Sequence, residues 1–188
     1  MPEHNSILSI LLRSIFIGFG FVIPVISFLK TSDLKKLHIK DLFVLTAVQA
    51  VRIGGILYTI LFIVQSCLMY SNKNETAWPG SVDYMFFGTY WFVYWFPPAM
   101  FLLLSQLLWI KKLYLKKTFL IILSLFLLML PSYRTIAFIV NIGKGMDAIK
   151  FSVVTPFSIL EFVLNIIVFI FIIFTIMLAG NKFKKIKE

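Results

Sequence analysis

Long apolar runs dominate this sequence and limit what it can fold into. Five stretches are each longer than the roughly 20 apolar residues that a helix needs to cross a hydrocarbon core of about 30 Å. They cover residues 6–29, 42–70, 85–110, 118–142 and 151–179, and the first, second and fourth contain one arginine each. With 60% hydrophobic residues, the chain lies outside the range of soluble domains. We therefore expect an all-α, multi-pass integral membrane bundle with five transmembrane helices.

The lysines are distributed unequally between the two sides of these helices. Twelve lie in the segments 30–41, 111–117 and 180–188, whereas the connections on the other side contain three. Cytoplasmic segments are the ones enriched in lysine and arginine, so we expect the N-terminus outside and the C-terminus in the cytoplasm. The expected location is the bacterial cytoplasmic (inner) membrane.

The net charge of +10 is spread over three short segments next to the membrane. Such a distribution indicates attraction to anionic membrane lipids, and it differs from the single basic face of a nucleic-acid-binding domain. We therefore expect membrane lipids as partners and no nucleic acid.

No internal repeat is visible and no connection is long enough to fold separately, so residues 1–188 are predicted to form a single transmembrane domain. The first cytoplasmic connection, "KTSDLKKLHIKD", combines lysines with spaced apolar residues. This pattern predicts a short interfacial helix in which Leu34 and Leu37 enter the headgroup layer.

The third apolar run contains the stretch "GTYWFVYWFPPAMFLL", with two adjacent prolines near its middle. Pro97 and Pro98 lack amide donors and leave carbonyl groups one turn earlier without their usual partners. We therefore predict a helix kink at this pair. The aromatic residues at the start of the stretch are typical of a membrane interface.

Small residues in the first two spans predict close helix packing. Gly18 and Gly20 lie in the first span, and Ala47, Ala50 and Gly54 share a stripe of the second. Without large side chains, neighbouring helices can approach closely at these positions.

Polar residues inside the spans are the candidate functional residues, because burying a charge in a membrane costs at least a few kcal/mol. The predicted outward-facing polar pocket contains Arg13, Gln49, Arg52, Tyr94, Arg134, Glu161 and Asn165. Three arginines against one carboxylate suit an anionic or quinone-like head group. In the alternative interpretation, Glu161 pairs with one arginine to lock the bundle, while Arg13 and Arg134 reach the outer interface.

The sequence argues against autonomous catalysis. Its two histidines, His4 and His38, lie outside the spans, so haem ligation by two histidines within the membrane is excluded. Cys67 is the single cysteine, and Glu161 is the single carboxylate within a span. We expect neither an enzyme nor a metal site. A quinone or a lipid is the ligand that such a pocket would suit.

One segment resembles a known family. The third span ends "SQLLWIKKL", and Arg134 follows twenty-two residues after Lys112. This arrangement resembles one helical hairpin of the NrfD-like quinol-interacting subunits of bacterial respiratory complexes, and it covers about forty residues. Those subunits are larger and have a glutamate beside the arginine, where this chain has Tyr133. The resemblance implies quinone contact.

Three functions follow from these observations as hypotheses. The first is a non-catalytic subunit of a larger inner-membrane assembly, which would contact other membrane proteins or further copies of itself. The second is a small oligomeric transporter or channel for an anionic solute. The third is a quinone-binding subunit of a respiratory complex that lacks its own haem.

Overall fold

The computed structural model describes residues 7–29, 33–72, 82–83, 86–88, 91–129 and 156–180. Within these ranges the chain is helical apart from short turns, and it contains no strand. The main helices are α1 (Ile7–Phe28), α2 (Leu34–Ser71), α4 (Trp91–Leu107), α5 (Lys111–Tyr114), α6 (Lys117–Met129) and α8 (Pro156–Ala179). The all-helical class expected from the sequence is therefore confirmed for this part of the chain.

Three helices are long and apolar enough to cross a membrane, namely α1, α2 and the segment Ile159–Ala179 of α8. They correspond to the first, second and fifth expected spans and indicate a membrane protein. Helix α4 has 17 residues and α6 has 13, so both are shorter than the apolar runs that contain them. Residues 130–142 of the fourth run lie outside the described residues. The count of five spans therefore stays a prediction.

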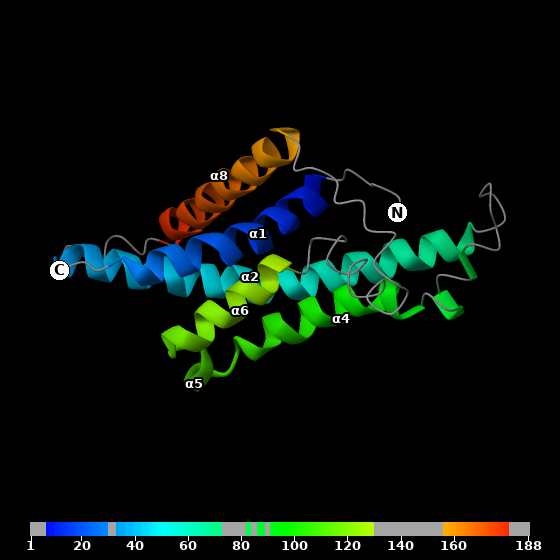
Figure 1. The fold of residues 1–188 in the computed structure, drawn as a ribbon, viewed down its shortest axis with the longest axis horizontal. Helices are drawn as coiled ribbons and strands as arrows, with labels where there is room; N and C mark the ends of the chain where they lie inside the picture. Colours follow the sequence, from blue (N-terminus) through cyan, green and yellow to red (C-terminus); the bar gives the residue numbers. More distant parts are fainter. Residues whose placement is uncertain are drawn as a thin grey trace, which may run out of the picture.

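Helix α2 is the longest described helix and runs along the long axis of the molecule, as Figure 1 shows. Its 38 residues extend about 57 Å at 1.5 Å per residue. Helix α1 packs against α2, α6 and α8, and α4 packs along α2. The first turns of α2 and the short helix α5 lie at the same end of the molecule (Figure 1). Helices α1, α4 and α8 run toward that end, whereas α2 and α6 run away from it (Figure 1).

The connection expected to form an interfacial helix is helical from Leu34 onward, but it is the beginning of α2 and not a separate short helix. Its position in the headgroup layer stays a prediction. The side chain of Asp33 accepts a hydrogen bond from the amide of Lys35 at 3.0 Å and caps the helix there. No glycine or proline separates this charged start from the apolar part of α2. The helix therefore continues without interruption.

Helix α4 continues through Pro97 and Pro98, and its helical assignment is unbroken from Trp91 to Leu107. The predicted kink at this pair stays a prediction. Helix α4 is antiparallel to α2, because Tyr94 contacts Ser66 near one end of the pair and Leu108, just after α4, contacts Arg52 near the other. The prolines are therefore held within a packed helix pair.

The core lies where α1 meets α2, α6 and α8. Its fully buried side chains are mostly large and apolar, and they include Phe16, Phe19, Ile23, Val48, Val51, Leu127, Phe169 and Ile173. Aromatic rings meet here: the ring centroids of Phe43 on α2 and Phe169 on α8 lie 6.2 Å apart, and Phe16 on α1 lies 4.5 Å from Phe101 on α4.

The predicted close packing at Gly18 and Gly20 is confirmed. A Cβ atom on Gly18 would overlap the side chain of Phe169 on α8. One on Gly20 would lie 2.7 Å from the Cβ of Leu128 on α6. Helix α1 therefore contacts two neighbouring helices through positions that have no side chain.

Candidate functional site

An ion pair joins α1 to α8. The Arg13 guanidinium lies 2.7 Å from a carboxylate oxygen of Glu161, and the two side chains keep 52% and 42% of their surface exposed. Each residue lies in the first two turns of its helix, which places the pair near one end of the bundle. An arginine has five donors, so this one short contact leaves part of its hydrogen-bonding capacity for groups outside the chain.

A buried polar pair lies beside the ion pair, one residue farther along α1 and one turn farther along α8. The Ser14 hydroxyl donates to the side-chain oxygen of Asn165 at 2.7 Å, and both residues are buried. The amide nitrogen of Asn165 donates in turn to the backbone carbonyl of Glu161 at 2.9 Å. These bonds satisfy the polar atoms of Asn165 in an apolar interface, where an unpaired group would cost several kcal/mol.

Arg52 occupies a different place, on the opposite side of α2 from that network. Its guanidinium donates to the backbone carbonyl of Leu108, just past the end of α4. The guanidinium carbon lies 5.1 Å from the ring centroid of Trp109 and 4.9 Å from that of Tyr114, which are cation–π distances. Its Nε atom is buried without a hydrogen-bond partner. Arg52 thus attaches α2 to the turn between α4 and α5.

Tyr94 forms a third polar contact, also between α2 and α4. Its hydroxyl lies 2.9 Å from that of the buried Ser66. The ring packs among aromatic neighbours, with the centroids of Phe62 and Phe86 each 5.0 Å away. Ser66 and Arg52 therefore belong to one stripe of α2 that faces α4.

The described residues of the predicted pocket thus occupy separate places. The structure brings Arg13, Glu161 and Asn165 together between α1 and α8, and it places Arg52 and Tyr94 at two levels between α2 and α4. The side chain of Gln49 is exposed on α2. Arg134 lies outside the described residues. Among the residues that the structure describes, no three His, Cys, Asp or Glu side chains gather to hold a metal ion.

The pairing of Glu161 with one arginine, expected in the alternative interpretation, is present with Arg13 as the partner. Sequence reasoning did not identify several other partners of these residues. Ser14, Trp109 and Tyr114 all contact predicted site residues. Ser14 carries a usable signal, because it is a polar residue next to Arg13 in an apolar span. The role of Trp109 and Tyr114 depends on the turn after α4, and the sequence suggested a continuous span to residue 110 instead.

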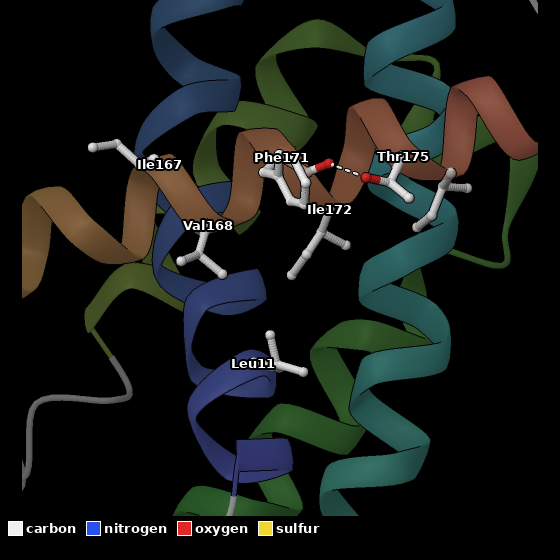
Figure 2. A pocket seen from close by; sticks show the side chains of 7 residues that line it. Leu11, Ile167, Val168, Phe171, Ile172 and Thr175 are labelled. Atoms are coloured by element: carbon white, nitrogen blue, oxygen red, sulfur yellow. Dashed lines mark hydrogen bonds between the residues drawn. The ribbon is translucent and has the colours of Figure 1, made fainter.

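An apolar groove lies beside α1 and α8, and Figure 2 shows its lining. Its volume is about 420 Å³. Leu11 of α1 and six residues of α8 line it, namely Ile167, Val168, Phe171, Ile172, Thr175 and Ile176. The Thr175 hydroxyl donates to the backbone carbonyl of Phe171 at 2.8 Å within α8 (Figure 2). The lining thus favours hydrocarbon over a polar ligand.

No protein-family model, curated protein or solved structure matches this chain. The resemblance of one hairpin to quinol-interacting subunits therefore stays a prediction from the sequence.

Proposed function

We propose that this chain is a non-catalytic subunit of a larger assembly in the bacterial inner membrane. In this proposal it has five spans, with its N-terminus outside and its C-terminus in the cytoplasm. The antiparallel course of α2 and α4 supports an up-and-down arrangement (Figure 1). Every lysine within the described residues lies in the first turns of α2 or in and beside α5 and the start of α6, at one end of the bundle. This distribution supports the orientation.

The observation that carries the proposal is the half-exposed ion pair between Arg13 and Glu161. On α8 the neighbours Leu160 and Leu164 are exposed and apolar, as expected for a surface covered by lipid or protein. A charge that faces hydrocarbon costs several kcal/mol. A partner protein that offers hydrogen bonds is therefore a more favourable neighbour for this ion pair than lipid chains. The pair therefore marks the surface through which the subunit contacts its assembly.

Exchanging the two charges tests this contact. The double variant Arg13→Glu with Glu161→Arg keeps an ion pair within the chain and reverses both charges that a partner meets. After mild detergent extraction, the tagged wild-type chain is expected to copurify with specific membrane proteins or with a second copy of itself. We expect the exchanged variant to lose at least about 90% of this material, because each misplaced charge costs more than about 1.4 kcal/mol, which is tenfold in affinity.

A matched control separates binding from folding. Leu178→Gln changes an exposed residue near the other end of α8, far along the helix from the ion pair, and should leave copurification unchanged. The thermal unfolding of the exchanged variant should remain within a few degrees of the wild type. A wild-type chain that purifies as a monomer without other proteins contradicts the proposed function.

The apolar groove favours a second candidate, binding of a quinone or another long-chain lipid. Filling the groove with Ile172→Trp should lower the amount of copurified quinone, measured by mass spectrometry of organic extracts. Leu178→Trp is the control, because Leu178 is exposed on α8 outside the groove. Equal quinone content in both variants contradicts this candidate.

A further inference from the structure

The chain makes a sharp corner where α4 ends and α6 begins. Helix α4 closes with three successive i to i+3 hydrogen bonds, which end at the amides of Leu108, Trp109 and Ile110. The four-residue helix α5 follows, and α6 starts at Lys117. We call residues 109–117 the lysine corner, because four of these nine residues are lysines and none is acidic.

The lysine corner is fixed to the rest of the bundle by Arg52. This side chain joins α2 to the corner through the Leu108 carbonyl and through the rings of Trp109 and Tyr114. Within the corner, the amide of Leu113 bonds the carbonyl of Ile110 at 2.9 Å. A surface held in this way loses little conformational freedom on binding.

The lysine corner exposes apolar and basic side chains together. Trp109, Ile110 and Leu115 are 57%, 49% and 63% exposed. The four lysines, Lys111, Lys112, Lys116 and Lys117, are exposed as well. A tryptophan beside lysines is the combination that suits the boundary between acyl chains and headgroups. The apolar residues can enter the acyl layer while the lysines remain at the level of the phosphates.

The neighbouring elements add positive charge to this surface. Helix α2 contributes Arg52. The ion pairs of Glu161 with Arg13 and of Asp33 with Lys36 join residues that do not belong to the corner. The lysine corner is thus complementary to a negatively charged layer. Because its apolar residues also need a hydrocarbon environment, a phospholipid fits better than a soluble anion.

We propose that the lysine corner is a binding surface for the headgroups of anionic phospholipids. Trp109, Ile110 and Leu115 anchor it in the acyl layer, and the four lysines bind the phosphates. Arg52 acts as a positioning residue that holds the corner at this level. This inference is independent of the proposed subunit function, because it needs no partner protein.

Lipid retention by the full-length chain tests the proposal. The protein is incubated in detergent with equal amounts of phosphatidylglycerol and phosphatidylcholine, and bound lipids are counted by native mass spectrometry. A lysine near an anionic surface contributes roughly fivefold to affinity. We expect wild-type protein to prefer phosphatidylglycerol by at least about fivefold. Replacing the four corner lysines with glutamine should abolish this preference.

The matched control removes three lysines from the same end of the bundle, by Lys35→Gln, Lys36→Gln and Lys40→Gln. This variant should lose less of its preference than the fourfold corner variant, because its lysines lie on α2, outside the lysine corner. A variant with arginine at the four corner positions keeps the charge and should keep the preference.

Three results would overturn the proposal. The first is an unchanged preference after the four replacements, and the second is an equal loss in the α2 control. The third is displacement of phosphatidylglycerol by millimolar inorganic phosphate, which would assign the site to a soluble anion. If the fourfold variant does not fold, the double replacements at Lys111 with Lys112 and at Lys116 with Lys117 should each lower the preference severalfold.

Discussion

Gly18 and Gly54 offer a direct comparison of two helix contacts. At Gly18 a Cβ atom would overlap Phe169, whereas at Gly54 it would lie at an ordinary 3.7 Å from Ile15 and Leu12. We expect Gly18→Ala to destabilise the protein by about 1–3 kcal/mol through overpacking. Gly54→Ala should be neutral or stabilising by up to about 1 kcal/mol, because alanine favours the helix. Thermal unfolding in detergent measures both, and equal stabilities would contradict the packing at Gly18.

The hydrogen bond between Ser14 and Asn165 can be measured by a double-mutant cycle. We expect a coupling free energy of about 0.6 kcal/mol, and at most about 1.7 kcal/mol, between Ser14→Ala and Asn165→Ala. Reversible unfolding in mixed micelles gives this value. Thr175→Ala is the control partner, because the Thr175 hydroxyl bonds its own helix and is exposed. A coupling of zero between Ser14 and Asn165 would contradict the buried bond.

At the residue scale, the sequence predicts which polar residues form contacts between helices. It predicts less well which residue each of them contacts. Glu161 and Asn165 are recognisable as polar residues in an apolar span. The choice of Arg13 as the partner of Glu161 depends on how far α1 and α8 are rotated and shifted relative to each other. The rotation and shift of the two helices depend on how their apolar side chains pack, for example Phe169 of α8 against Gly18 of α1. The sequence around either residue does not specify this packing.

At the scale of the element, the start of α2 depends on its cap. Asp33→Ala removes the acceptor for the amide of Lys35 and should cost about 1 kcal/mol of local helix stability. Hydrogen exchange of the first amides of α2 should then become roughly fivefold faster. Asp33→Asn keeps an acceptor and should restore slow exchange. Amides in the middle of α2 should not change, since opening the exposed first turn does not disturb the core.

Helix boundaries were the least predictable part of the fold. The charged start of α2 reads as a separate interfacial helix, because its hydropathy changes at residue 42 although its backbone conformation does not. Conversely, the apolar run to residue 110 conceals the end of α4 at Leu107. Hydropathy reports the surroundings of a segment. Whether a helix continues depends on its backbone hydrogen bonds. Just past the end of α4, the Leu108 carbonyl accepts a hydrogen bond from Arg52 of α2.

At the scale of the whole molecule, the length and composition of the apolar runs suffice to predict a helical membrane protein. Three of the expected spans appear as helices of sufficient length. The orientation depends on charges in the connections, and several of these connections lie outside the described residues. It therefore needs a direct measurement.

The single cysteine makes that measurement simple. Cys67→Ser gives a chain without cysteine, into which one cysteine can be placed at Lys36 or Lys112, or at Asn72 after the last turn of α2. Helix α2 is about 57 Å long, which is enough to place its two ends on opposite sides of a hydrocarbon core of about 30 Å. We expect a membrane-impermeant maleimide to label Asn72→Cys in intact cells, and to label Lys36→Cys and Lys112→Cys only in inverted vesicles.

The two possible failures of this labelling pattern have different meanings. Labelling of Lys36→Cys and Asn72→Cys from the same side would show that α2 does not cross the membrane. The reverse pattern would show that it crosses in the opposite direction, against the twelve lysines expected in the cytoplasm. Labelling of Lys112→Cys from the side opposite to Lys36→Cys would contradict the common end that α5 shares with the start of α2. The lysine corner would then face a different leaflet from the other described lysines.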